Sequence, residues 1–454
     1  MKRNVTLLNS INNIRFSNLP EDIVLYVKHH ILDAVGEAVA GAKTEAGHRL
    51  IKEAKMQRSD EESTVITDGA KLTAPVAYRA NSELCRLSGL CRLSGYDDLI
   101  YTLPSHPGRS IIHASLSAGE KQDVQLEDVI TAILSISELV LQLGRVIRDI
   151  AWPPGKPHPD PALDFCFTLP GLAALAKGLL EEQRQEEEEC DFAPLVLETL
   201  SLLEEPYIKD NSISINLELI RKVGESLNPI ESTKSAWRRC LTRKAGLRLS
   251  LFDHLTNAPI KALTRTIGRE QVQPENIENI LLKGIQWMKL FKFKDELMEE
   301  AIHRIASTAF LHMHGIYPED SWYLNGRLNN HQIAELAGKI MLAEDFEDYW
   351  ESLNSTTYQY SYMAQVNTIN ERPKIGRIKY IISDMENLRT KQQFRNRFQD
   401  NVLDIMGKRQ GGELYDRIIN QESIGVPELM KLTRPRFWDA HLLRKLGVLA
   451  DNIS

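Results

Sequence analysis

The chain has 454 residues, of which 43% are hydrophobic and 26% charged, the balance of a globular protein in water. Its net charge of −7 at pH 7 argues against a nucleic-acid partner, which would favour a basic domain or a basic stripe. The chain holds no apolar run long enough to span a bilayer, so we expect no membrane span and no membrane partner. This length exceeds one ordinary hydrophobic core and predicts two or three domains.

The number and positions of the cysteines indicate the cellular compartment. The cysteines form no CxxC pair and are scattered along the chain: Cys85, Cys91, Cys166, Cys190 and Cys240. An odd, scattered set is typical of free thiols in a reducing cytoplasm. The first residues are basic but carry no apolar core of signal-peptide length. The sequence therefore predicts a cytoplasmic protein.

Helical periodicity dominates the first part of the chain. Residues 19–42, LPEDIVLYVKHHILDAVGEAVAGA, combine Pro20 at a helix start, apolar residues at three-to-four spacing, and Gly41 near the stop. Residues 63–69 alternate like a short strand or an extended link. A further helix is expected to open at Pro75.

The middle of the chain alternates between helices and irregular segments. Residues 126–147 predict a long, mostly apolar helix that is buried on several sides. Residues 151–164 carry five prolines and are expected to be a loop. The acidic run over residues 181–191 is typical of a solvated helix end or surface loop. Helices are expected again over residues 232–255.

From about residue 275 the pattern changes to strands mixed with helices. IENILLKGIQW and PKIGRIKYIISD are typical of strands, with the helical segments DELMEEAIHRIASTAFLHM and NNHQIAELAGKIM between them. The sequence therefore predicts a mainly α fold. A large all-helical domain is built from both chain ends, residues 1–270 and 391–454, and a smaller α+β lid domain, residues 271–390, is inserted between them. We expect a ligand in the cleft between two such domains.

Motifs for common cofactors are missing from the sequence. There is no GxGxxG after a strand and no GxxxxGK[ST], so no nucleotide-binding motif is predicted. His312 and His314 could suggest a metal, but side chains two residues apart on a helix diverge, and no convincing third ligand lies nearby in sequence. We therefore predict neither a nucleotide site nor a metal site from these motifs.

The strongest chemical cluster lies in residues 94–116, SGYDDLIYTLPSHPGRSIIHASL. Asp97, Asp98, His106 and Arg109 fall within thirteen residues, on a segment broken by prolines and a glycine. A loop with two acids, an imidazole and a guanidinium near a helix start could bind an anion and move a proton. The alternative is that the acids cap a helix or pair at the surface.

This cluster and its surroundings resemble the MmgE/PrpD family over residues 19–147. The stretches that carry the resemblance, in the family's order and spacing, are LPEDIVLYVKHHILDAVGEAVAGA, STVITDGAKLTAPVAYRANSEL, GYDD, SHPG and LEDVITAILSISELV. The family includes 2-methylcitrate dehydratase, cis-aconitate decarboxylase and iminodisuccinate epimerase. The resemblance implies a large helical domain with a smaller α+β lid, usually as a homodimer. It also implies cofactor-free proton abstraction next to a carboxylate of a small di- or tricarboxylic acid.

The resemblance also implies candidate site residues. His106 falls on the family's His-Pro histidine, and Asp97 and Asp98 fall on its paired acids. His158, in KPHPD, matches the second His-Pro histidine of the family. Lys234, in STK, is similar to the family lysine that meets a substrate carboxylate. Because adjacent acids on a helix point about 100° apart, we expect only one of the two aspartates to face a cleft.

Further cations complete the predicted site. Lys289 or Lys292, in WMKLFKFK, lies where the family has a second basic residue from the lid, and Arg109 is a third candidate for carboxylate binding. The chain also departs from the family, because Gly95 and Arg92 stand where the family commonly has an aspartate and a histidine. Three functions therefore stay open: a dehydratase or decarboxylase, an isomerase or epimerase, and a non-catalytic member that binds an anion or a sibling subunit.

A repeated hexapeptide precedes the acidic pair. LCRLSG occurs at residues 84–89 and again at residues 90–95, which is one copy more than the family spacing. Six residues added within an α-helix advance it by about 600°, so that the residues after the insertion lie some 240° out of phase. We therefore expect the extra copy to bulge or form a loop, which the Ser-Gly ending of each copy would tolerate. A recent slippage duplication without function is the alternative.

Overall fold

A computed structural model shows a mainly helical protein. It describes residues 14–57, 60–90, 98–99, 107–151, 169–184, 193–210, 246–247, 254–283, 295–314, 331–342, 359–369, 371–381, 391–420 and 423–435. Helices make up 73% of these described residues, which confirms the predicted mainly α fold class. Within these ranges no helix is both long enough and apolar enough to cross a membrane.

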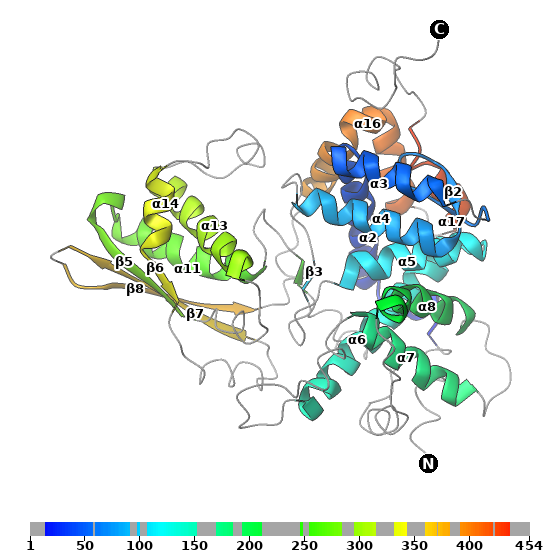
Figure 1. Cartoon of the computed structure of the whole chain (residues 1–454), viewed down its shortest axis with the longest axis horizontal. Helices are drawn as coiled ribbons and strands as arrows, with labels where there is room; N and C mark the ends of the chain where they lie inside the picture. Colours follow the sequence, from blue (N-terminus) through cyan, green and yellow to red (C-terminus); the bar gives the residue numbers. More distant parts are fainter. Residues whose placement is uncertain are drawn as a thin grey trace, which may run out of the picture. The chain divides into compact units, whose positions relative to one another are not determined.

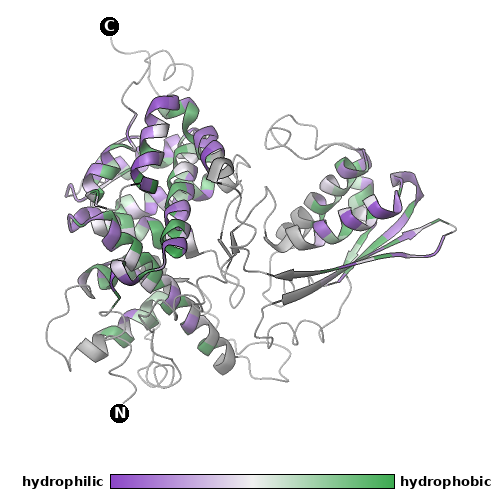
Figure 2. Ribbon diagram, turned by 180° about the vertical axis from the view of Figure 1, so that it is seen from behind, coloured by the Kyte–Doolittle hydropathy of each residue, from purple (hydrophilic) through white to green (hydrophobic). Residues whose placement is uncertain are grey.

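The chain divides into two compact units. The first unit is Met1–Ser94, Ile100–Arg243 and Leu388–Ser454, and the second is Gly95–Leu99 and Lys244–Asn387. The elements of the first unit are η1 (Phe16–Asn18), α2 (Glu21–Ala42), α3 (Glu45–Met56), β1 (Ser63–Thr64), β2 (Lys71–Leu72), α4 (Ala74–Leu90), α5 (Pro107–Lys121), α6 (Leu126–Ala151), α7 (Leu169–Arg184), α8 (Ala193–Asp210), α16 (Lys391–Asn420) and α17 (Val426–Lys431) (Figure 1). Hydrophobic and hydrophilic residues alternate along these helices, as expected where one face is buried (Figure 2).

Helix α2 lies at the centre of the first unit. It packs most extensively on α4 and α16, with further contacts to α3, α5 and α6. Pro20 occupies the N-cap position, and the acids Glu21 and Asp22 in the first turn suit the positive end of the helix dipole. A Cβ atom at Gly41 would overlap the carbonyl oxygen of Leu84 on α4, so this close helix crossing requires glycine.

The C-terminal part of the chain completes the same unit. Helix α16 packs along α2, where Gly36 approaches the ring of Phe398. The buried Lys28 side chain donates a hydrogen bond from Nζ to the carbonyl oxygen of Ile419, 2.8 Å away. Residues nearly four hundred positions apart in the sequence therefore share one core.

The second unit is a four-stranded sheet with helices. Its elements are β3 (Asp98–Leu99), β4 (Gly246–Leu247), α11 (His254–Glu270), η4 (Pro274–Asn276), β5 (Ile277–Lys283), α13 (Asp295–Met313), α14 (His331–Gly338), β6 (Ile340–Leu342), β7 (Gln359–Thr368) and β8 (Lys374–Ile381). The strand order is β6-β5-β7-β8, parallel between β5 and β6 and antiparallel elsewhere. Tyr362, Ala364 and Val366 alternate with less buried residues along β7, so one face of the sheet is the core face.

Three details of this unit differ from the sequence prediction. Helix α11 belongs to the second unit rather than to residues 1–270, because it packs on β7 and β8 and Gly376 lies against Thr266. Strand β4 lies inside residues 232–255, which were expected to be helical. The helical pattern of NNHQIAELAGKIM is helical only to Gly338, after which β6 begins at Ile340.

The first copy of LCRLSG is part of helix α4. Leu84, Cys85 and Leu87 are buried, and the Cys85 thiol donates to the carboxylate of Glu37 on α2 at 3.2 Å. This copy therefore packs into the core. The second copy lies outside the described residues after Leu90, so its predicted loop stays a prediction.

We expect a variant lacking one LCRLSG copy to fold with a thermal midpoint equal to or above that of the full chain. Because the copies are identical, deleting residues 84–89 or 90–95 gives the same sequence. The remaining copy can fill the packed position on α4, and the connection between α4 and α5 becomes shorter. Thermal unfolding followed by circular dichroism checks this, and insolubility or a midpoint several degrees lower would show that both copies belong to the core.

Candidate active site at the start of helix α5

The structure describes two of the predicted site residues. Arg109 lies in the first turn of α5, in the first unit, and Asp98 forms β3 with Leu99, in the second unit. The backbone of Asp98 pairs with Leu247 of β4. The other predicted residues lie outside the described ranges: Asp97, His106, His158, Lys234, Lys289 and Lys292.

The first turn of α5 differs from the predicted loop. Pro107, Gly108 and Arg109 are all helical, so Arg109 lies on a helix rather than in the predicted loop. Proline suits the first turn of a helix because its missing N–H has no partner there and its φ angle is already helical. Arg109 is therefore held by a regular helix, which fixes its position better than a loop would.

Helices α4 and α5 meet beside Arg109. The hydroxyl oxygens of Ser82 and Ser110 lie 3.4 Å apart across this contact. On α4, one turn beyond Ser82, the Arg86 guanidinium donates from Nε to Glu83 Oε2 at 2.6 Å and from its second nitrogen to Glu83 Oε1. The hydrogen bonds that Arg86 donates to Glu83 raise the pKa of Arg86, while burial and the positive charge of Arg109 oppose the shift.

A buried imidazole lies one turn below Arg109 on α5. His113 is fully buried, and neither of its ring nitrogens has a hydrogen-bond partner. Burial, helped by the charge of Arg109, lowers the pKa of His113 to about 3. The Ala34 carbonyl opposes this shift without reaching hydrogen-bond geometry. His113 is therefore neutral near pH 7.

His30 on α2 is a second neutral imidazole in this unit. Its pKa is lowered to about 3, first by burial and then by the neighbouring His29. Its ring lies 4.2 Å, centroid to centroid, from the ring of Tyr26. His30 and His113 do not stand out in the sequence, because their spacing matches the apolar positions of their helices.

We expect acid to destabilise the helical unit between about pH 6.5 and pH 3. The folded pKa values of His30 and His113 lie below the ordinary value of 6.5, so the folded state resists protonation. The stabilising contribution of each neutral histidine is therefore fully present above pH 6.5. As the pH drops below 6.5, the free energy of unfolding decreases by about 1.4 kcal/mol per pH unit for each histidine. Denaturant unfolding at several pH values measures this slope.

Histidine variants separate this effect from other acid effects. His113→Gln should reduce the slope of unfolding free energy against pH by the contribution of one histidine. His48→Gln should change this slope less, because His48 is only partly buried. An unchanged slope in His113→Gln would mean that the imidazole is protonated in the folded protein.

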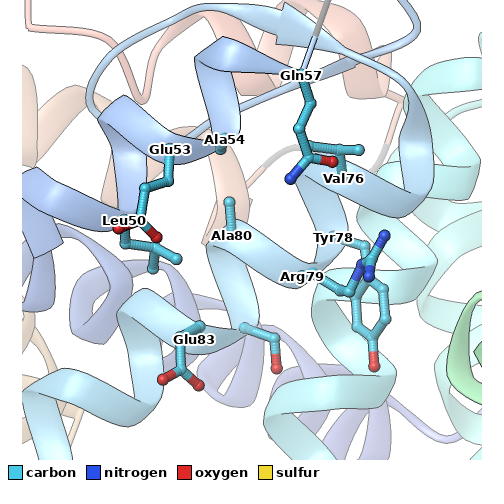
Figure 3. Close-up of a pocket in the computed structure, with 10 residues that line it drawn as sticks. Leu50, Glu53, Ala54, Gln57, Val76, Tyr78, Arg79, Ala80 and Glu83 are labelled. Carbon is cyan, nitrogen blue, oxygen red and sulfur yellow. The ribbon is translucent and has the colours of Figure 1, made fainter. Parts of the chain in front are cut away.

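A pocket of about 390 Å³ lies between α3 and α4 (Figure 3). Its lining residues are Leu50, Glu53, Ala54, Gln57, Val76, Tyr78, Arg79, Ala80, Ser82 and Glu83. Neither Arg109 nor Asp98 lines it. Its wall nevertheless includes Ser82, whose hydroxyl contacts Ser110 of α5, and Glu83, which pairs with Arg86 on α4. The pocket is therefore a neighbour of the candidate site.

Side chains that could bind a metal do not gather in the described parts of the chain. No group of three His, Cys, Asp or Glu residues is placed there to hold a metal ion. His314, from the sequence motif HMH, instead has its ring Nδ1 2.8 Å from the carbonyl oxygen of Phe310.

A helical unit drawn from both chain ends, together with a separate sheet unit, defines a two-unit, mainly α protein. Residues 5–149 match the model of the MmgE/PrpD N-terminal domain, which supports membership of the MmgE/PrpD family and confirms the resemblance seen in the sequence. This family is known for dehydratase, decarboxylase and epimerase activities. No curated protein matches the chain.

Proposed function

We propose that this protein is a cofactor-free lyase, of the dehydratase or decarboxylase type, that acts on a small di- or tricarboxylic acid. The observation that carries the proposal is the family match over residues 5–149, the segment that contains Asp97, Asp98, His106 and Arg109. Arg109 in the first turn of α5 supports it, because a guanidinium is a cation of the kind that binds a carboxylate substrate. A homodimer in the cytoplasm is part of the same proposal.

The reaction would begin with removal of a proton from the carbon next to a carboxylate. His106 would act as base or acid, with Asp97 and Asp98 orienting it and His158 as a second imidazole. Proton removal builds enolate-like negative charge, which fixed cations stabilise in a closed cleft.

Further cations would bind the carboxylates of the substrate. These are Arg109, Lys234 and one of the two lid lysines, Lys289 or Lys292.

Two other functions have specific support. Isomerase or epimerase chemistry needs the same proton abstraction without a leaving group. A non-catalytic member that binds an anion or a sibling subunit is favoured by Gly95 and Arg92, which replace the aspartate and histidine that the family commonly has there.

One experiment separates these functions. The protein is incubated in D2O with a panel of citrate-like and itaconate-like acids, and each acid is followed by NMR. A new product from one acid supports the lyase, and deuterium exchange without net product supports an epimerase. Neither result across a broad panel would overturn the enzyme proposal and favour a binding role.

A further inference from the structure

We propose that the pocket between α3 and α4 binds a small ω-amino acid, a ligand with an ammonium group and a carboxylate at the two ends of a short apolar chain. The ammonium group would contact Glu53 of α3, and the carboxylate would contact Arg79 of α4. The inference goes beyond the proposed function, because it assigns a zwitterionic ligand to a pocket that neither Arg109 nor Asp98 lines.

The pocket has the size and the apolar floor of a small-ligand site. Its volume of about 390 Å³ lies within the range of pockets that hold small molecules. Ala54 of α3 and Ala80 of α4 are buried members of one hydrophobic cluster, and Val76 packs against it. All three line the pocket. Because the alanine side chains are short, they leave room between the two helices for the apolar chain of a ligand.

Opposite charges lie on opposite sides of this floor. Glu53 is on one side of the pocket and Arg79 on the other, with Ala54 and Ala80 between them (Figure 3). This arrangement suits a ligand whose own charges are separated by methylene groups. In an α-amino acid both charged groups are attached to one carbon, so they would not reach both sides of the pocket.

Glu53 is the acid to which the ammonium group is assigned. Its carboxylate has neither an ion pair nor a hydrogen bond within the ranges that the structure describes, so it is not paired with Arg79 across the pocket. Glu83 also lines the pocket, but it already accepts two hydrogen bonds from Arg86. A ligand ammonium group would supply the charge-assisted partner that Glu53 lacks there.

Arg79 is held in place by its own helix. Its Nε donates a hydrogen bond to the carbonyl oxygen of Pro75, 3.3 Å away, which fixes the base of the guanidinium at the pocket wall. A guanidinium carries five N–H donors in a planar fork, so it can bind a carboxylate in addition to its contacts within the protein.

A solvated hollow with ordinary surface charges is the competing explanation, and the same helix offers a control. Glu45 begins α3, its side chain is 88% exposed and lies 3.8 Å from Arg49, and it does not line the pocket. Glu45→Gln therefore removes the same charge from the same helix as Glu53→Gln but leaves the pocket unchanged.

The test is NMR titration of the full chain with 5-aminopentanoate at low salt, beside pentanoate and pentylamine, which each keep one of its two charges. Glu53→Gln should weaken binding of 5-aminopentanoate roughly 10-fold and leave pentanoate unaffected. Arg79→Gln should weaken 5-aminopentanoate and leave pentylamine unaffected. Ala54→Leu should abolish binding, because the larger side chain fills the pocket. Glu45→Gln should bind like wild type.

Several results would overturn this site. One is absence of 5-aminopentanoate binding to the wild-type protein, and another is an unchanged affinity in Glu53→Gln. Equal weakening in Glu53→Gln and Glu45→Gln would show a general effect of protein charge. Glycine that binds as tightly as 5-aminopentanoate would contradict the two-sided arrangement.

The design survives a variant that does not fold. Glu53 is exposed, so Glu53→Gln should keep the fold. If circular dichroism shows that Arg79→Gln or Ala54→Leu is unfolded, Glu53→Gln and the comparison with glycine decide.

Discussion

Replacing His106 with alanine is expected to lower kcat by about 10²- to 10⁴-fold on any acid that the wild-type protein turns over. The reason is the proposed role of His106 as the group that moves the substrate proton. His106 directly precedes Pro107, the first residue of α5, and the sequence pattern gives it no place on a periodic apolar face. The fold should therefore survive the substitution.

Steady-state kinetics and thermal unfolding check both parts of this expectation. His331→Ala is a suitable control, because His331 is an exposed histidine at the start of α14. Wild-type rates in His106→Ala would remove this imidazole from the mechanism. A large drop in the unfolding midpoint would instead assign it a structural role.

Glu120→Ala is expected to destabilise the helical unit by roughly 3–5 kcal/mol, the cost of removing one partner of a buried polar cluster. The side chain of Glu120 is fully buried near the end of α5. Its carboxylate accepts hydrogen bonds from the Ser63 hydroxyl at 3.2 Å and from the Thr64 backbone and hydroxyl at 2.6 Å each, and it lies 3.2 Å from Lys71 Nζ. Alanine would leave all of these donors without their acceptor.

Equilibrium unfolding in denaturant measures this loss. Glu198→Ala removes a carboxylate that is 29% exposed and pairs with Lys121, so it should cost no more than about 1 kcal/mol. Glu120→Gln should fall between the two, because the amide oxygen can still accept. Equal stability of Glu120→Ala and Glu198→Ala would mean that solvent reaches the hairpin of β1 and β2 and replaces the lost acceptor.

The helices could be predicted because their signals are local. Pro20 and the three-to-four apolar spacing led to α2, which ends at Ala42, next to the predicted stop at Gly41. The short strands could not be predicted in this way. Asp98 of β3 pairs with Leu247 of β4, and Ile340 of β6 pairs with Ile280 of the predicted strand β5. The strands β3, β4 and β6 therefore depend on partners far along the chain rather than on a local pattern.

The chemistry of the candidate site was only partly readable from the sequence. Arg109 stood out because a histidine and two acids precede it within a few residues. The contact between α4 and α5 beside Arg109 could not be predicted, because it joins Ser82 and Ser110, which are 28 positions apart. The Glu83–Arg86 spacing was visible as a helical pair but is common on solvated helices.

The most direct test of the central claim, cofactor-free proton abstraction next to a carboxylate, is deuterium wash-in by protein treated exhaustively with a metal chelator. NMR in D2O would monitor the hydrogen on the carbon beside a carboxylate, with His106→Ala measured in parallel. The proposed function predicts exchange or a new product with at least one acid, at a rate that the chelator leaves unchanged and His106→Ala abolishes. Loss of both with the chelator, or neither exchange nor product with any acid of a broad panel, would contradict it.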